Sequence, residues 1–356
     1  MDSGKENENI VKMKVLVTGG AGFIGTNYVY FHLEARPQDE IVVLDALTYS
    51  GHRENLADAE KKGVKFALGR IEDEKNVREL FERESFDAVV HFAAESHVDR
   101  SIKDPGVFIE TNVMGTRVLL DAAKDFGVKR FHHISTDEVY GDLGLGSTEK
   151  FTENSQLKPS SPYSASKAAS DHLVLAYYRT FGLAVTVSRC SNNYGPYQST
   201  ENFIPLFVSK AFLGENLPLY GKGENVRDWL FVRDHCEAIL TILERGKIGE
   251  VYNIGGNEER MNIDVAKIIV NALNKPESLI KFVEDRKGHD ERYAIDFSKL
   301  QSELGWSPKT SFEEGMQETI DWYTLSSYER SYSSWRNRVK ARSADKSHKQ
   351  TSATGL

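Results

Sequence analysis

The sequence predicts an α/β fold, with a doubly wound parallel sheet over residues 13–200, which strands later in the chain could complete, and a smaller mixed α/β region over residues 201–325. Short apolar runs alternate with longer amphipathic segments through the first part, which is typical of buried parallel strands and the helices that cover them. The second observation is a glycine-rich stretch directly after the first apolar run. Beyond about residue 200 the alternation becomes irregular, and this change sets the boundary between the two regions.

Length and composition fit a globular protein without special scaffolding. The 356 residues are 40% hydrophobic, which suits one large domain or a large and a smaller one. No apolar run approaches the roughly 18 residues of a membrane span, and residues 1–9 lack the apolar segment of a signal peptide. We therefore expect a soluble, cytoplasmic protein without membrane contact. Cys190 and Cys236 suit neither a disulfide scaffold nor a metal site, so no metal is expected.

The net charge of −8 is unevenly distributed along the chain. Residues 326–356 hold seven Lys and Arg against two acidic residues, so this stretch carries +5 and the rest carries −13. Because the stretch is Ser-rich and poor in apolar residues, we expect a disordered basic tail there, and a second disordered tail at residues 1–12. Contact of the basic tail with RNA or an anionic surface is the alternative, but the acidic body argues against a nucleic-acid partner.

The glycine-rich stretch lies between a predicted strand at residues 14–18 and a predicted helix at residues 23–35. Gly19, Gly22 and Gly25 allow a tight turn, close approach of a pyrophosphate and packing of helix on strand, as in a Rossmann fold. The pyrophosphate would lie at the positive N-terminus of the helix. A purely structural glycine turn is the alternative, but the flanking strand and helix favour dinucleotide binding.

A second predicted strand, at residues 41–44, is followed by Asp45, twenty residues after Gly25. A carboxylate at this place accepts a hydrogen bond from a ribose 2′-hydroxyl and repels a 2′-phosphate. The sequence therefore predicts NAD as the cofactor in preference to NADP.

The alternation of strands and helices continues to about residue 200. We predict strands at residues 64–68, 88–92, 131–134 and 184–189, and helices at residues 74–84, 104–126 and 162–181. The strand at 88–92 is followed by Ala93 and Ala94, whose small side chains let a cofactor pass close to the backbone.

Thr136, Asp137 and Glu138 follow the strand at residues 131–134. Ligands of open α/β sheets bind outside the carboxyl ends of the strands. Two neighbouring carboxylates there can act as acid and base if their environments separate their pKa values. A solvated acidic turn is the alternative interpretation of an isolated Asp-Glu pair.

Tyr163 and Lys167 are four residues apart in the helix that begins at Pro162, so they share one helical face. A neighbouring ammonium is expected to lower the pKa of the phenol, which makes it a base for a hydroxyl proton while hydride leaves the same carbon. The Tyr-x-x-x-Lys spacing is common and usually structural. After a dinucleotide fold and a hydroxyl-bearing strand end, it favours catalysis.

The region beyond residue 200 is expected to form a small cap on the larger domain. Predicted elements occupy residues 202–212, 217–220, 234–245, 251–254 and 262–273. Arg227, Arg286 and His289 are candidates for binding a diphosphate, although each alone also fits a surface or ion-paired residue.

Together these motifs resemble the nucleoside-diphosphate-sugar 4,6-dehydratase branch of the extended short-chain dehydrogenase/reductase family, over residues 14 to about 323. The matching stretches are residues 18–25 (TGGAGFIG), 45–51 (DALTYSG), 91–102 (HFAAESHVDRSI), 135–141 (STDEVYG), 161–167 (SPYSASK), 190–196 (CSNNYGP), 227–230 (RDWL) and 288–290 (GHD). The Thr-Asp-Glu run is the specific part, because related epimerases generally lack both carboxylates and UDP-glucuronate decarboxylases usually keep only the glutamate.

The resemblance implies a role for each candidate catalytic residue. Tyr163, supported by Lys167 and Thr136, would take the proton of the sugar 4-hydroxyl as hydride passes from C4 to NAD. Glu138 would then remove the C5 proton, and Asp137 would protonate the departing 6-hydroxyl. Return of hydride to C6 gives a 4-keto-6-deoxy sugar nucleotide and regenerates NAD. The substrate would be dTDP-glucose or UDP-glucose, which differ by one methyl group.

The same resemblance implies two sets of binding residues. The cofactor set is Gly19, Gly22, Phe23, Ile24, Gly25, Asp45, Leu47, Thr48, Arg70, Ile71, Ala93, Ala94, Thr111, Tyr163, Lys167 and Asn193. The substrate set is Ser96, Thr136, Asn192, Asn202, Phe203, Pro218, Tyr220, Arg227, Asn262, Arg286 and His289. The family also implies a homodimer, paired through the helices at about 107–126 and 162–181.

Four positions depart from the family pattern. Arg70 stands where an aspartate normally contacts the adenine, and its guanidinium would stack on the ring instead. Asn202 replaces a lysine, Phe203 a leucine and Lys287 a proline. Two other functions remain open: a UDP-sugar 4-epimerase or decarboxylase, which the presence of Asp137 disfavours, and a non-catalytic NAD-binding scaffold, which the complete catalytic set disfavours.

Overall fold

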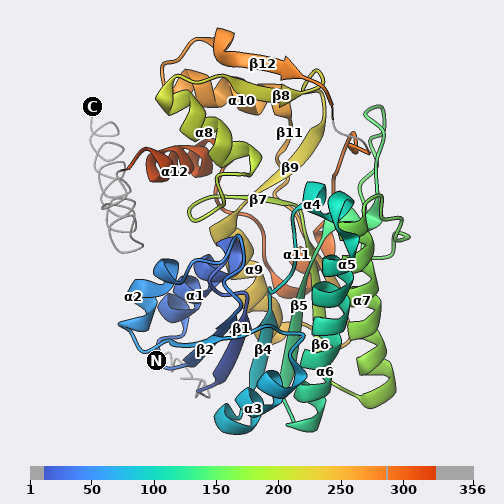
Figure 1. The fold of residues 1–356 in the computed structure, drawn as a ribbon. Helices are drawn as coiled ribbons and strands as arrows, with labels where there is room; N and C mark the ends of the chain where they lie inside the picture. Colours follow the sequence, from blue (N-terminus) through green and yellow to red (C-terminus); the bar gives the residue numbers. More distant parts are fainter. Residues whose placement is uncertain (1–11, 286–287, 326–356) are drawn as a thin grey trace, which may run out of the picture.

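A seven-stranded parallel sheet forms the centre of the computed structural model, which describes residues 12–285 and 288–325 (Figure 1). The strand order is β10-β6-β5-β4-β1-β2-β3. The strands are β1 (Lys14–Thr18), β2 (Glu40–Asp45), β3 (Lys65–Leu68), β4 (Ala88–His91), β5 (Arg130–Thr136), β6 (Val185–Cys190) and β10 (Val251–Ile254). The doubly wound parallel sheet predicted from the sequence is confirmed. The two terminal tails expected at residues 1–12 and 326–356 lie outside the described residues, apart from Lys12.

Helices cover both faces of the sheet, because the side chains of each strand alternate between them. Val15 and Val17 of β1 pack on one face, and Leu16 packs on the other. The first face is covered by α1 (Phe23–Ala35) and α9 (Val232–Arg245), and the second by α3 (Glu74–Glu84), α6 (Thr116–Asp125) and α7 (Pro162–Phe181). With both faces buried, the strands read as nearly continuous apolar runs.

The chain beyond residue 200 forms a second, smaller region but also returns to the large sheet. The smaller region contains α8 (Phe203–Leu213), β8 (Leu217–Tyr220), β9 (Val226–Phe231), β11 (Glu259–Met261), α10 (Asn262–Ala272), β12 (Ile280–Val283) and α12 (Phe312–Thr324). Strand β7 (Asn192–Tyr194) pairs with β9, so the smaller region starts directly after β6. Between these elements, α9 packs on α1 and β10 completes the edge of the large sheet beside β6.

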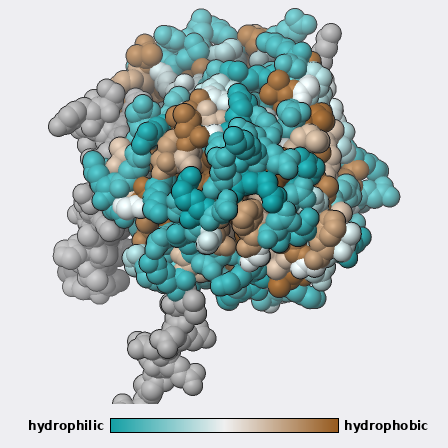
Figure 2. Space-filling model, turned by 60° about the horizontal axis from the view of Figure 1, so that its bottom comes forward, coloured by the Kyte–Doolittle hydropathy of each residue, from teal (hydrophilic) through white to brown (hydrophobic). Residues whose placement is uncertain are grey.

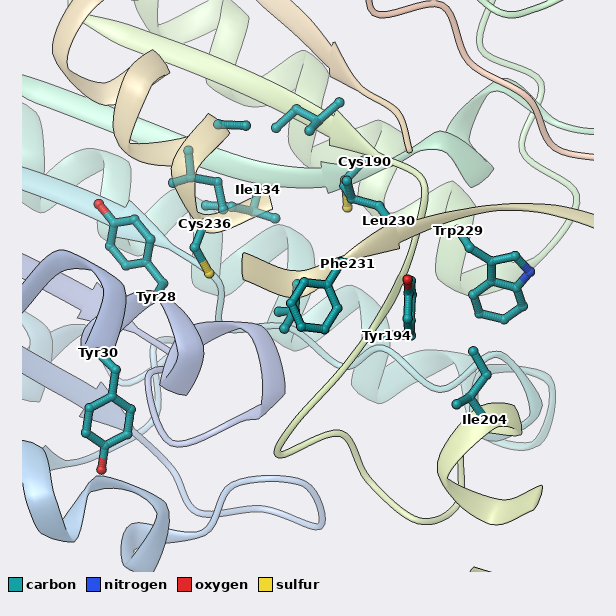
Figure 3. Close-up of a cluster of buried hydrophobic side chains, with 14 of the residues drawn as sticks. Tyr28, Tyr30, Ile134, Cys190, Tyr194, Ile204, Trp229, Leu230, Phe231 and Cys236 are labelled. Carbon is teal, nitrogen blue, oxygen red and sulfur yellow. The ribbon is translucent and has the colours of Figure 1, made fainter. Parts of the chain in front are cut away.

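One buried cluster joins the two regions (Figure 3). Tyr28 of α1 and Cys236 of α9 lie at one end of the cluster, and Trp229 of β9 and Ile204 of α8 lie at the other. Tyr194 lies between them, with its ring centroid 5.6 Å from Phe231 and 6.2 Å from Trp229. Because the core is shared, the smaller region is fixed against the sheet by burial of apolar surface.

The helix predicted over residues 104–126 is not regular. It consists of α5 (Pro105–Phe108), a π-helical turn η2 (Ile109–Gly115) and α6. Within η2, the Asn112 amide accepts from the Glu95 N–H at 2.8 Å and donates to the Ser166 hydroxyl at 2.8 Å. The wider turn thus holds a polar side chain between the end of β4 and α7, and π-helical turns of this kind are common at functional sites.

Within the described part of the chain, no helix combines the length and apolarity needed to cross a bilayer. Figure 2 shows the lower face of the molecule as mainly hydrophilic, with apolar residues in small separate patches.

A buried ion pair ties α7 to the sheet. Arg189 of β6 donates from Nε to Asp171 Oδ2 of α7 at 2.8 Å, and both side chains are almost completely buried. Burial opposes ionisation of Asp171, but the hydrogen bond with His133 and the charge of Arg189 outweigh it and lower the Asp171 pKa to about 2. The carboxylate is therefore charged and paired at neutral pH.

We expect Asp171→Asn to lower the free energy of unfolding by about 3–5 kcal/mol at pH 7, because it leaves Arg189 buried without a compensating charge. The folded pKa of Asp171 lies below its usual value of 3.8, so its stabilisation is present above that pH and is lost as the pH falls toward about 2. Urea unfolding of both proteins across this range should show the difference shrinking. Asp125→Asn, at an exposed pair with Arg78, is the control with little expected change. Equal stability of the Asp171 variant and the native protein at pH 7 would contradict this account.

Candidate active site

The candidate residues meet in one continuous cleft at the carboxyl ends of the parallel strands. One cavity contains the glycine turn, Asp45, the Thr136–Glu138 run and the Tyr163–Lys167 pair. A second cavity extends toward α8, β8 and α10. Both are lined by Ser96, Glu138, Asn192, Asn193, Gln198 and Asn202, so the two cavities adjoin along these residues.

The first cavity has the shape of a dinucleotide cradle around the glycine turn. A Cβ on Gly19, whose φ is +71°, would lie 2.7 Å from the Ala93 nitrogen, and one on Gly25 would lie 2.2 Å from the Gly19 carbonyl oxygen. Helix α1 begins at Phe23, and no side chain among the described residues caps it. Its first amides are therefore available to a phosphate group, and the residues present fit a dinucleotide.

Asp45 holds the turn that follows β2. Its carboxylate accepts from the Ala21 N–H at 2.9 Å and from the Leu47 N–H at 2.8 Å. Burial raises the pKa of Asp45, and these two backbone hydrogen bonds oppose the rise. Thr48 lines the cavity beside Asp45. The side chain of Leu47 is not among the lining residues and packs against the core, so this residue acts on the site through its amide.

The far end of the first cavity is formed by Arg70, Ile71 and Thr111. Arg70 is largely exposed and pairs with Glu72 at 2.9 Å. Stacking of Arg70 on an adenine ring stays a prediction.

Asp137 and Glu138 lie in a 3₁₀ turn, η3 (Asp137–Tyr140), that directly follows β5. Thr136 caps this turn by accepting from the Glu138 N–H at 3.3 Å. Asp137 is only 2% exposed, and its Oδ2 has no hydrogen-bond partner within the described residues. Burial, and then the charges of Glu138 and Asp228, raise the pKa of Asp137 well above its usual value. A carboxyl held in the protonated state can act as an acid at neutral pH.

Tyr163 and Lys167 are positioned by the start of α7. Ser161 caps the helix through a reciprocal pair of hydrogen bonds with Ser164, and Pro162 occupies the first helical position. Lys167 lies one turn later and donates to the Ile134 carbonyl oxygen at 2.8 Å. Burial lowers the pKa of Lys167 to about 8.

The prediction that Lys167 lowers the pKa of Tyr163 is wrong for this structure. Burial, followed by the charge of Glu138, raises the Tyr163 pKa well above its usual value, and a hydrogen bond from Thr136 opposes the rise. Sequence spacing places the two residues on one face, but it does not reveal that the phenol is desolvated beside a carboxylate.

The second cavity collects most of the predicted substrate residues. Ser96, Asn192, Asn202, Phe203, Pro218, Tyr220, Arg227, Asn262 and His289 line it. Arg286 lies outside the described residues. The rings of Phe203 and Trp229 are stacked. Nδ1 of His289 lies 2.7 Å from a carboxylate oxygen of Asp285.

Arg227 has a structural role in addition to its place in the cavity. Its guanidinium donates to the backbone carbonyls of Val226 at 2.8 Å and Asp290 at 2.9 Å. The same group lies 4.4 Å from the centroid of the Tyr293 ring. Arg227 therefore fixes the loop that carries His289, and binding of a diphosphate by Arg227 stays a prediction.

Three further contacts at the site were not predicted from the sequence. Nδ1 of His235 on α9 lies 2.8 Å from the side-chain amide oxygen of Asn193, so His235 orients that amide. Tyr49 accepts from the Ser96 N–H at 3.3 Å, and the Arg100 guanidinium lies 3.9 Å from the Tyr49 ring centroid. These residues stand far apart in the chain, and no local spacing signals their contacts.

The parallel sheet, the glycine cradle and the Tyr163–Lys167 helix define the short-chain dehydrogenase/reductase class. Within it, the model of the family described as GDP-mannose 4,6 dehydratase matches residues 16–319, and the chain belongs to this family. A dTDP-glucose 4,6-dehydratase of Xanthomonas campestris pv. campestris (strain B100) is 54% identical over 328 residues, covering 86% of this chain and 92% of the relative. The dTDP-glucose 4,6-dehydratase 1 of Escherichia coli (strain K12) is 50% identical, with 87% and 92% covered.

Solved structures agree with these sequence matches. DesIV, a dTDP-glucose 4,6-dehydratase from Streptomyces venezuelae with NAD and TYD bound, has a TM-score of 0.84 and 49% identity, and the match covers 87% of this chain and 97% of that one. A UDP-glucose 4-epimerase of Thermus thermophilus in complex with NAD has a TM-score of 0.80 but only 34% identity, with 87% and 99% covered. The fold is thus common to both enzymes, whereas the sequence is more similar to the dehydratase.

We expect NAD to bind at least about 10-fold more tightly than NADP. The reason is that a 2′-phosphate beside the Asp45 carboxylate would bring like charges together. A repulsion of about 1.4 kcal/mol corresponds to a tenfold loss of affinity. Asp45→Asn should narrow this preference. Titration of purified protein, stripped of nucleotide, with each cofactor measures it. Asp73→Asn is the matched control, since Asp73 caps α3 outside the cavity and Asn also caps well. Tighter binding of NADP by the native protein would refute the assignment.

Proposed function

We propose that this protein catalyses the NAD-dependent dehydration of a nucleoside-diphosphate glucose, dTDP-glucose or UDP-glucose, to the 4-keto-6-deoxy sugar nucleotide and water. The observation that carries the proposal is the carboxyl pair of η3, in which burial raises the pKa of the deeply buried Asp137 well above its usual value beside the less buried Glu138. Besides the base that takes the 4-hydroxyl proton, elimination needs a base for the C5 proton and an acid for the departing 6-hydroxyl, whereas epimerisation at C4 needs no such pair at C5 and C6. Relatives at about 50% identity carry the name dTDP-glucose 4,6-dehydratase.

The cofactor half of the cleft supplies the redox chemistry. When bound, NAD accepts hydride from the sugar and later returns it, and its positively charged nicotinamide favours ionisation of a neighbouring phenol. The residues proposed to hold it are those of the glycine turn, Asp45, and the small pair Ala93 and Ala94.

Tyr163 acts on the 4-hydroxyl of the sugar. As a phenolate it takes the hydroxyl proton while C4 is oxidised to the ketone. The hydrogen bond from Thr136 favours the phenolate. Because burial and Glu138 favour the neutral phenol in the described structure, the base function depends on the additional positive charge of the bound cofactor.

Glu138 and Asp137 carry out the elimination. The C4 ketone acidifies the hydrogen on C5, and the Glu138 carboxylate removes it. Asp137 gives its proton to the 6-hydroxyl, which leaves as water. The raised pKa of Asp137 favours the protonated state from which it donates, which is the division of acid and base that two differently placed carboxylates allow.

We also propose that the protein is a homodimer paired through α7 and the neighbouring helical layer. Large apolar side chains are exposed along this layer, which includes α4 (Val98–Lys103): Ile102, Val107, Ile109, Met114, Tyr178 and Phe181. Helices α5, α6 and α7 lie side by side on one flank of the molecule (Figure 1). Exposed apolar side chains gathered on one flank are typical of a protein–protein interface.

Substitution of the three reacting side chains separates oxidation from elimination. Asp137→Asn and Glu138→Gln should still oxidise C4, because Tyr163 is intact, but elimination should slow by ~10²–10⁴, the usual effect of losing a general acid or base. Reduced cofactor should then accumulate, visible by its absorbance in a single turnover. Tyr163→Phe should produce no reduced cofactor. Identical traces for all three variants would refute this division of roles.

Native activity should also fall as the pH rises through the raised pKa of Asp137, since only the protonated carboxyl can donate. This loss should be absent from the oxidation step measured in Glu138→Gln.

Isotope transfer decides between dehydratase and epimerase. Substrate with deuterium at C4 should give a 4-keto-6-deoxy product with deuterium at C6, because the hydride removed from C4 returns to C6. In D₂O, unlabelled substrate should gain solvent deuterium at C5. Mass and NMR analysis of the product from dTDP-glucose and from UDP-glucose gives both the reaction and the preferred nucleotide. Label retained at C4 without loss of water would support the epimerase instead.

A further inference from the structure

Tyr140 ends the same 3₁₀ turn that carries Asp137 and Glu138. Its side chain is 1% exposed, and its ring stacks on Phe151 with centroids 5.0 Å apart. The stack and the burial explain an aromatic residue at this place, but they do not explain the hydroxyl group, because phenylalanine would fill the same space.

The Tyr140 hydroxyl makes two hydrogen bonds inside the protein. It donates to the Asn253 amide oxygen of β10 at 2.7 Å and accepts from Arg189 of β6 at 3.0 Å. Asn253 is itself fixed, because its amide nitrogen donates to the carbonyl oxygens of Phe151 and Asp296. Burial raises the pKa of Tyr140 to about 12, so the hydroxyl keeps its proton at any working pH.

The contacts of Arg189 extend this arrangement to the helix of Tyr163 and Lys167. Arg189 pairs with Asp171, which lies one helical turn after Lys167 on α7. The second oxygen of Asp171 lies 3.5 Å from His133 Nε2, and the same nitrogen lies 3.5 Å from Lys167 Nζ. A chain of buried polar groups therefore runs from the end of the carboxylate turn to the lysine of the Tyr-Lys pair.

We propose that Tyr140 is a positioning residue, which sets the carboxylate turn relative to α7 through its hydrogen bonds to Arg189 and Asn253. The two groups of side chains that act on the sugar lie on different elements, η3 and α7, and must reach neighbouring carbon atoms of one sugar, C4 for Tyr163 and C5 and C6 for the two carboxyl groups. A buried hydroxyl bonded to both β6 and β10 fixes the end of η3 more narrowly than ring packing does. This inference rests on the proposed dehydratase reaction.

The test is Tyr140→Phe, which keeps the ring, its stack on Phe151 and its contact with the Arg189 guanidinium, 4.9 Å from the ring centroid. Oxidation at C4 in a single turnover should stay within about 3-fold of native, whereas elimination should slow by about 10- to 100-fold, because a misplacement of about 1 Å can cost about 10²-fold. Reduced cofactor should accumulate as in Glu138→Gln, and kcat should fall with KM little changed.

Tyr252→Phe is the matched control. Tyr252 precedes Asn253 on β10 and is also fully buried, and its hydroxyl also makes two hydrogen bonds, from the Lys247 N–H and to Glu303. These bonds do not lead to η3, so both steps should keep native rates in this variant. Thermal unfolding of both variants shows whether loss of stability, rather than geometry, accounts for a change in rate.

Three outcomes overturn the inference: equal slowing of oxidation and elimination in Tyr140→Phe, native rates for both steps, or the same accumulation of reduced cofactor in Tyr252→Phe. Failure of the proposed function is distinguishable, because native protein would then form no dehydrated product from either sugar nucleotide. If Tyr140→Phe does not fold, Asn253→Ala, which removes the acceptor of the hydroxyl, should give the same selective slowing, and native kinetics for that variant would equally overturn the inference.

Discussion

Retention of a proton on Asp137 is the constraint on which the proposed chemistry depends. The carboxyl is buried at the end of β5, beside Glu138 and within the field of Asp228, and all three factors disfavour its ionisation. Glu138 follows it directly in the same turn and is more exposed. In the proposed mechanism, the more buried of these two carboxyl groups is the proton donor and the more exposed one is the base.

Burial in the same cleft also opposes ionisation of the Tyr163 phenol. A phenol in a desolvated cleft beside a carboxylate resists ionisation, and the hydrogen bond from Thr136 only partly offsets this. In the proposed mechanism, the positive charge of a bound cofactor would supply the additional stabilisation that the phenolate needs. Lys167 has a lowered pKa of about 8 for the same reason, since its ammonium is removed from water.

Behind the cleft, the protein balances its buried charges by pairing them. Asp171 and Arg189 form a buried ion pair, and His133 lies between Asp171 and Lys167 with its pKa lowered to about 4 by burial and by the charge of Lys167. A buried pair of this kind adds little net stability compared with apolar residues, but it defines geometry, because breaking it leaves a charge unpaired. The shared core of Figure 3 has the corresponding role for apolar groups, since it fixes α8 and β9 against the sheet.

The sequence by itself determined the features that depend on local stereochemistry. The apolar runs, the glycine spacing and the i, i+4 placement of Tyr163 and Lys167 each follow from backbone geometry over a few residues, so the sheet, the cradle and the residues of the cleft were predictable. Features that depend on contacts between residues far apart in the chain were evident only from the tertiary structure. The π-helical turn around Asn112, the choice of β10 as the later strand that completes the sheet, and the bond between Tyr140 and Asn253, 113 residues apart, have no local pattern. The direction of the Tyr163 pKa was predicted wrongly for the same physical reason: desolvation and charge–charge interaction are set by everything that surrounds a group in space, whereas sequence spacing reveals only its neighbours along one helix.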